Sequence, residues 1–185
     1  MKTLCIAVAL STLLVGSLSA QQMPVSMKIG NTPLILNGSG VRTKSFLQLY
    51  QAGLYLPQKS KNASEIVNSD VPMSIRLEIT SRFVSQSKML TALNEGFVNS
   101  TGGKVAQLKN EIEQFRACFS DKLVMGDILQ MTYTPGVGTA VSKNGKAKGV
   151  IKGLPFKQAM FGIWLSAKPA DKTLKQAMLQ GPKRG

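Results

Sequence analysis

An Asn-Gly pair near the C-terminal end of the chain places the strongest constraint on its fold. Asn144-Gly145 stands at the centre of the segment GTAVSKNGKAKGVIKG. Asn-Gly is the preferred centre of a two-residue β-hairpin turn, because both residues readily adopt positive φ angles. The two halves of the segment are therefore expected to pair antiparallel, and the preceding segment KLVMGDILQMTYTPG to form another strand that ends at Pro135-Gly136.

Strand patterns also fill the first part of the chain. Asn31 centres a turn between two short strands, and Gly38 and Gly40 are expected to end the second of them. Residues 42–56 are predicted to form one long strand that Pro57 stops. A half-buried strand is indicated where apolar residues alternate with polar ones: Met73, Ile75, Leu77 and Ile79.

Helical periodicity separates these strands. Asn62 can cap a short helix, and residues 85–119 carry two apolar helical stripes with a break at Thr101-Gly102-Gly103. The segment LPFKQAMFGIWLS is predicted to be an amphipathic helix, and Asp171 can cap a last short one. Strands joined as hairpins, with helices between them, predict an α+β domain in which helices cover an antiparallel sheet.

The N-terminus is typical of an export signal. Lys2 precedes the apolar run TLCIAVALSTLLVG and the small residues SLSA. This arrangement predicts a secretory signal peptide over residues 1–20, a single mature domain over 21–185 and a periplasmic location. The alternative is a membrane anchor, but the run is shorter than the ~20 residues that span a bilayer. We therefore expect no stable membrane insertion after cleavage.

Catalytic chemistry is restricted by composition. The chain has no histidine, which excludes His-ligated metal sites and His-dependent triads. No glycine-rich phosphate loop is present, so we expect no metal and no cofactor. Cys118 is the one cysteine outside the signal segment and is expected to be buried and structural.

The formal net charge is +14. A basic surface could bind nucleic acid, anionic lipid or an acidic ligand. The lysines are scattered singly over turns and helix faces, and an exported protein rarely meets nucleic acid, so we expect no nucleic-acid partner.

The segment RTKSFLQLYQAGLYLP (residues 42–57) raises a question, because a cation alternates there with aromatic residues. In one continuous strand, Arg42, Phe46 and Tyr50 would share a face. Either Arg42 is a surface residue whose stem covers Phe46, or it points into a cleft.

The run GSGVRTKSFLQLYQAGLYLP, together with FGIWLSAKPADKTLKQAMLQG near the C-terminus, resembles the bacterial chalcone isomerase-like proteins. These are exported relatives of plant chalcone isomerase and of plant fatty-acid-binding proteins. The resemblance covers about residues 24–181 and implies an open sandwich of sheet and helices. It also implies that Arg42 binds a ligand oxygen or a fatty-acid carboxylate, and that Tyr50 and Phe46 belong to the same binding site.

The sequence departs from the isomerases of this family at their catalytic tyrosine. No tyrosine occurs between Ile79 and Thr101, where Ser85, Gln86, Ser87, Thr91 and Asn94 offer polar groups instead. We therefore expect a non-catalytic protein that binds a small amphipathic acid such as a fatty acid. The alternatives are an intramolecular lyase of chalcone isomerase type and a protein-interaction domain whose cleft is filled by its own side chains. The oligomeric state is left open.

Overall fold

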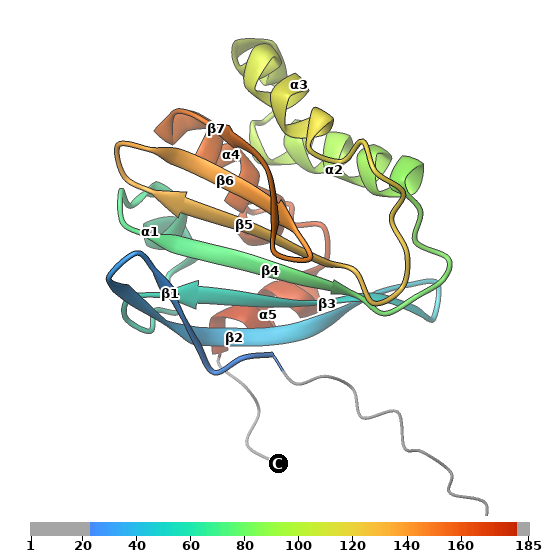
Figure 1. The fold of residues 1–185 in the computed structure, drawn as a ribbon, viewed down its shortest axis with the longest axis horizontal. Helices are drawn as coiled ribbons and strands as arrows, with labels where there is room; N and C mark the ends of the chain where they lie inside the picture. Colours follow the sequence, from blue (N-terminus) through green and yellow to red (C-terminus); the bar gives the residue numbers. More distant parts are fainter. Residues whose placement is uncertain (1–22, 181–185) are drawn as a thin grey trace, which may run out of the picture.

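The computed structural model describes residues 23–180, which form a seven-stranded antiparallel sheet with helices on one side (Figure 1). Neighbouring strands follow one another in sequence: β1 (Ser26–Ile29), β2 (Thr32–Lys44), β3 (Leu47–Leu56), β4 (Met73–Ile79), β5 (Ile128–Thr134), β6 (Gly138–Lys143) and β7 (Lys146–Ile151). The hairpin at Asn144-Gly145 is confirmed, with φ angles of 51° and 77°. The predicted α+β fold class is therefore correct. The predicted signal peptide lies outside the described residues.

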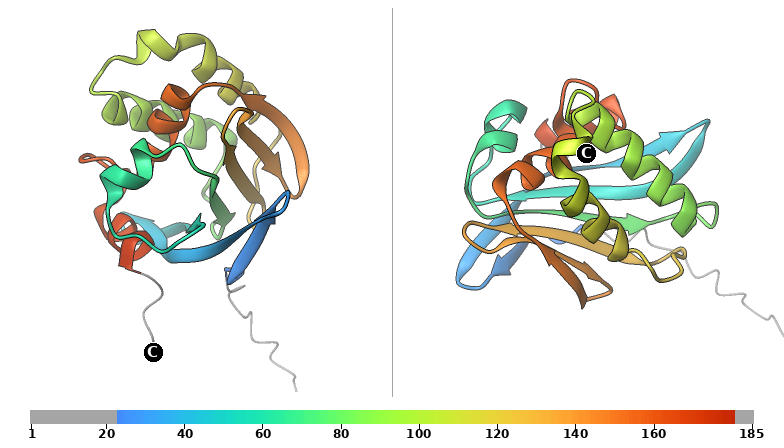
Figure 2. Two further views of the ribbon diagram at one scale, coloured as in Figure 1. Left: turned by 90° about the vertical axis from the view of Figure 1, so that its left-hand side faces the viewer. Right: turned by 90° about the horizontal axis from the view of Figure 1, so that it is seen from above.

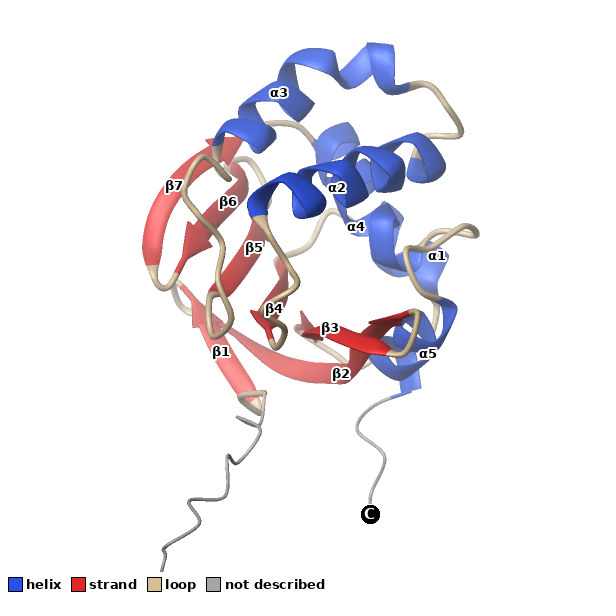
Figure 3. Ribbon diagram, turned by 90° about the vertical axis from the view of Figure 1, so that its right-hand side faces the viewer, coloured by secondary structure: helices blue, strands red, loops and turns tan. Residues whose placement is uncertain are grey.

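The helices occupy the concave side of the curled sheet (Figure 2, Figure 3). They are α1 (Ala63–Asn68), α2 (Gln86–Ser100), α3 (Lys109–Ala117), α4 (Leu154–Leu165) and α5 (Lys172–Gln180), with a 3-10 turn at Val105–Leu108 before α3. Helices α2 and α4 pack on each other, α3 lies against β7, and α5 lies against β2. Within the described residues no helix is both long and apolar enough to cross a membrane.

The two predicted helix caps are confirmed. Asn62 Oδ1 accepts the backbone N–H of Glu65 at 3.1 Å, and Asp171 Oδ1 accepts that of Leu174 at 2.9 Å. Each cap satisfies one of the N–H groups that a helix start leaves without an internal partner.

The predicted single strand over residues 42–56 is wrong. The chain reverses at Ser45-Phe46, whose φ angles are 47° and 66°, and this two-residue turn joins β2 to β3. Positive φ angles at both central residues are characteristic of a type I′ hairpin turn. The turn was missed because Ser-Phe is an unfavourable sequence for it. Gly38 and Gly40, which were expected to end a strand, lie inside β2.

A bulge in β2 decides which residues face the helices. Between the pairs Leu36–Tyr55 and Gly38–Leu54, one extra residue, Asn37, stands in β2. After a bulge, the alternation of side chains between the two faces of the sheet is shifted by one residue. Leu34 and Leu36, before the bulge, belong to a small apolar cluster on the face turned away from the helices. Arg42, after it, lies on the helix side, where it contacts Tyr50 of the main core.

Helices α2 and α4 approach closely at two glycines. A Cβ on Gly96 would lie 2.7 Å from Ile163 Cγ2, and one on Gly162 would lie 2.8 Å from Ser100 Cβ. This contact buries α4 on nearly all sides, so the expectation of an amphipathic α4 with an exposed face is wrong. The result is a rigid helical layer opposite the sheet.

Two buried groups complete the core. Cys118 is confirmed as a buried free thiol. Lys157 of α4 is fully buried, which the sequence did not indicate. Its ammonium donates to the backbone carbonyls of Ile66, Val67 and Ser69 at 2.8 to 2.9 Å and thereby caps the end of α1.

Candidate ligand-binding site

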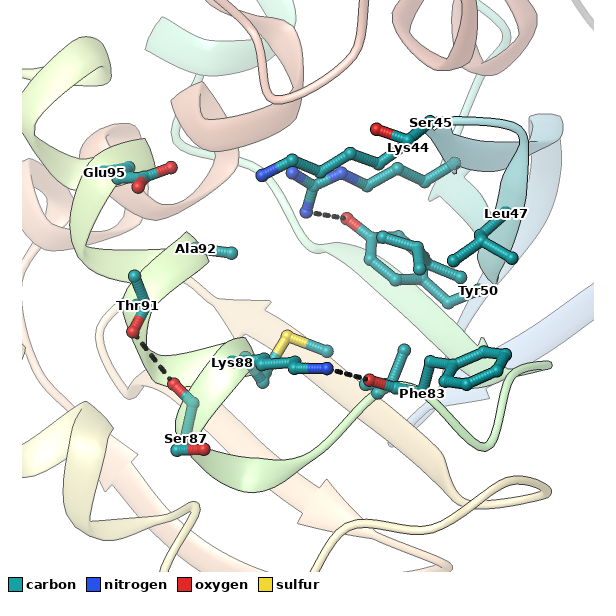
Figure 4. Close-up of a pocket in the computed structure, with 14 residues that line it drawn as sticks. Lys44, Ser45, Leu47, Tyr50, Phe83, Ser87, Lys88, Thr91, Ala92 and Glu95 are labelled. Atoms are coloured by element: carbon teal, nitrogen blue, oxygen red, sulfur yellow. Dashed lines mark hydrogen bonds between the residues drawn. The ribbon is translucent and has the colours of Figure 1, made fainter.

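A cavity of about 470 Å³ lies between the β2–β3 hairpin and α2 (Figure 4). Its size is in the range of roughly 300–1,000 Å³ that is usual for small-molecule sites. The residues that line it come from the hairpin on one side and from α2 with its preceding loop on the other: Arg42, Lys44, Ser45, Leu47, Leu49, Tyr50, Phe83, Val84, Ser87, Lys88, Met89, Thr91, Ala92 and Glu95.

Arg42 and Tyr50 meet in this cavity because they are direct partners on adjacent strands. Arg42 Nη1 lies 3.4 Å from Tyr50 Oη, and the guanidinium carbon lies 5.6 Å from the centroid of the ring. Arg42 makes no ion pair among residues 23–180. The nearby carboxylate of Asp171 instead accepts backbone N–H groups of Thr43 and Leu174. The guanidinium therefore keeps donors free for an anion.

Tyr50 is held in place from the opposite layer. Trp164 of α4 donates its indole N–H to Tyr50 Oη at 3.0 Å, and only 2% of Tyr50 is exposed. Burial raises the pKa of Tyr50, an effect that the charge of Arg42 opposes. The phenol is therefore neutral at ordinary pH. Because its oxygen accepts from Trp164 and Arg42, its own O–H is left to donate to a ligand in the cavity.

The remaining lining combines two lysines, one carboxylate and three hydroxyl groups with an apolar wall. Lys44 extends from the hairpin toward the side where Glu95 lies, and Lys88 Nζ donates to the carbonyl of Phe83 at 3.2 Å (Figure 4). The lining thus contains three cations, Arg42, Lys44 and Lys88, and one carboxylate, Glu95. The apolar wall consists of Leu47, Leu49, Val84, Met89 and Ala92. This division is suited to a ligand with an anionic head and an apolar body.

Comparisons with known proteins show which family the chain belongs to and which solved structure it resembles. The family model described as chalcone isomerase-like matches residues 16–180. The chain belongs to the chalcone isomerase-like family. Among solved structures it is similar to a fatty-acid-binding protein of Arabidopsis thaliana, with a TM-score of 0.67 and 20% identity over 85% of this chain and 91% of that one. At that identity the similarity shows the shared fold. A search of curated proteins finds no match.

Phe46, the third predicted site residue, is not part of the cavity wall of this chalcone isomerase-like domain. It occupies the hairpin turn and is 100% exposed, while its neighbours Ser45 and Leu47 line the cavity. The prediction that strand alternation aligns Phe46 with Arg42 and Tyr50 is wrong, because the turn interrupts the strand.

The α2 wall of the cavity carries hydroxyl groups. Ser87 and Thr91 line the cavity, but Ser85 caps α2 and Gln86 donates to the carbonyl of Phe119. Asn94 accepts from Arg116 at 2.8 Å. No phenol reaches the cavity from α2, so the acidic groups at the site are Tyr50 and Glu95.

Sequence reasoning missed four contributors to the site. Trp164 lies in the GIWL motif, but nothing in the sequence indicated its contact with Tyr50. Lys44, Lys88 and Glu95 were also not foreseen, because their meeting depends on how α2 crosses the hairpin. A second hollow, of about 590 Å³, lies between the ends of α1 and α2, the 3-10 turn and α4, and contains none of the predicted residues.

Proposed function

We propose that this protein binds a small amphipathic carboxylic acid, such as a medium or long fatty acid, in the cavity beside the β2–β3 hairpin. The observation that carries the proposal is Arg42, which has no ion pair among the described residues 23–180 and lies beside a buried phenol in a half-apolar cavity. A guanidinium binds a carboxylate with two parallel hydrogen bonds. The shared fold with a fatty-acid-binding protein supports the same ligand class.

In the proposed complex, each wall of the cavity holds a different part of the ligand. The carboxylate accepts from Arg42 and from the Tyr50 hydroxyl, and Lys44 and Lys88 add positive charge around it. The acyl chain lies against the apolar wall, where each buried methylene contributes about 0.8 kcal/mol. In this proposal the protein is exported by its signal peptide, acts in the periplasm, and needs no cofactor.

Replacing Arg42 by alanine is expected to weaken acid binding by roughly 10- to 150-fold, because a hydrogen bond to a charged group contributes about 1.5 to 3 kcal/mol. A fatty alcohol or methyl ester of equal length is expected to lose little, since it has no carboxylate to pair. Isothermal titration calorimetry on delipidated protein measures both. Lys61→Ala, which removes the same charge at an exposed position outside the cavity, is the matched control.

The companion substitution Tyr50→Phe should cost less affinity than Arg42→Ala, because only one of the hydrogen bonds that it removes is to the ligand, that bond comes from a neutral donor, and the ring is kept. If the wild type binds acid and alcohol equally well, or if Arg42→Ala weakens both by the same factor, Arg42 has a structural role and the proposal fails.

One observation favours a second candidate, an intramolecular lyase of chalcone isomerase type. Arg42 and Tyr50 present two donors in one cavity, as stabilisation of an enolate requires. The α2 wall, however, adds Ser87 and Thr91 in place of a phenol. We therefore place binding ahead of catalysis.

A further inference from the structure

Exposed apolar side chains gather at one end of the molecule, around the mouth of the cavity. Three segments meet there: the hairpin turn (44–47), the loop before α2 (80–85) and the loop before β5 (120–127). Backbone hydrogen bonds hold the two loops to the adjacent strand ends, from Thr80 N–H to the carbonyl of Leu49 near the start of β3 at 3.1 Å and from Gly126 N–H to the carbonyl of Ile79 at the end of β4 at 2.8 Å. This end faces the reader in Figure 3. The large apolar residues exposed on it are Phe46, Leu47, Phe83, Val124 and Met125.

Phe46 is the most unusual of these residues. Its side chain is 100% exposed, and its φ of 66° is unfavourable for a bulky residue. At this position of a type I′ turn, Asn or Gly would cost less. Neither packing nor turn geometry within the described chain therefore explains a phenylalanine here. A partner outside the chain would explain it.

The charges at this end indicate what kind of partner. Lys44, Arg82, Lys88 and Lys122 make no ion pair within residues 23–180. The two aspartates of the loop before β5 are each neutralised, Asp121 by Lys148 and Asp127 by Lys143. Aromatic side chains with a ring of unpaired cations are the combination that binds the interface of an anionic bilayer.

We propose that this end of the molecule docks on an anionic phospholipid bilayer, with Phe46 and Phe83 in the interface and Arg82 and Lys122 against the head groups, while Lys44 and Lys88 remain at the cavity mouth. Because Ser45, Leu47 and Phe83 line the cavity, docking places the cavity mouth at the membrane surface. The contact is peripheral, since the buried part is a few side chains on three loops. Docking does not depend on the proposed acid ligand.

The test is co-sedimentation of the folded protein with vesicles. Wild type should bind vesicles of phosphatidylcholine with phosphatidylglycerol, bind vesicles of phosphatidylcholine alone at least tenfold less, and be released by salt, because head-group attraction is screened. Phe46→Asn should lower the partition coefficient roughly tenfold, in line with the transfer of a phenylalanine side chain. It should leave thermal stability equal or higher, since Asn tolerates a positive φ.

Matched control variants distinguish docking through this end of the molecule from non-specific binding to vesicles. Val137→Asn changes another exposed apolar residue in a turn at the opposite end of the sheet and should leave binding unchanged. Arg82→Gln with Lys122→Gln should reduce binding more than Lys59→Gln with Lys61→Gln, although both pairs remove two charges. Equal binding to both kinds of vesicle, or equal effects of Phe46→Asn and Val137→Asn, would overturn the proposal.

Discussion

Replacing Lys157 by methionine should lower the free energy of unfolding by about 3 kcal/mol, because it leaves three carbonyl groups at the end of α1 without their donor. The same ammonium lies 5.4 to 5.5 Å from the ring centroids of Tyr133 and Phe161, contacts that the variant also loses. Urea denaturation followed by circular dichroism measures the change. The control Lys168→Met, at an exposed position, should remain within about 0.5 kcal/mol of wild type. Equal stability of the two variants would show that the capping contact contributes nothing.

The pH dependence of stability gives a second measure of the same group. Burial lowers the pKa of Lys157 to about 8, although Asp70 opposes the shift. In the unfolded chain a lysine titrates near ~10.4. Between these two values the unfolded chain holds a proton that the folded one has lost, so stability rises with pH in that window, by at most about 3 kcal/mol. Lys157→Met should lack this rise, and an identical profile for both proteins would contradict the assignment.

Chalcone isomerisation by this protein is expected to be at least about 100-fold slower than by a plant isomerase on the same substrate. A preorganised donor at the developing oxyanion typically contributes a factor of roughly 100 to 1,000 in rate. The α2 wall supplies Ser87 and Thr91 rather than a phenol. The measurement is the loss of chalcone absorbance under single-turnover conditions.

A denatured sample corrects that rate for spontaneous cyclisation. A rate within tenfold of the plant enzyme would show that Arg42 and Tyr50 suffice for catalysis. The intramolecular lyase would then become the better account of the cavity.

The two hairpin turns show what local sequence can and cannot predict. Asn144-Gly145 was predicted because its residues favour the positive φ angles that the turn needs. Ser45-Phe46 adopts the same kind of turn without such residues, so the signal was absent. The cost of that conformation is offset by the long pairing of β2 with β3, which no local pattern shows.

Arg42 and Tyr50 were predicted to share a cleft, and the structure brings them into one cavity for a different reason. The prediction used alternation along one strand, whereas the structure pairs them across two strands after the bulge at Asn37. Their role in binding remains a prediction. Lys157 was missed for a related reason: a lysine in a helical pattern is normally exposed, and only the fold brings the end of α1 to it.

The central claim is that Arg42 holds a carboxylate in the cavity, and an NMR titration tests it most directly. A fatty acid with a ¹³C-labelled carboxyl group is bound to the protein, and its chemical shift is followed as pH falls. Because Arg42 stabilises the charged form, the bound carboxyl should titrate at a lower pH than the free monomeric acid, and Arg42→Ala should raise its pKa. A bound carboxyl that titrates at or above the pH of the free acid, or that does not respond to Arg42→Ala, would contradict the account.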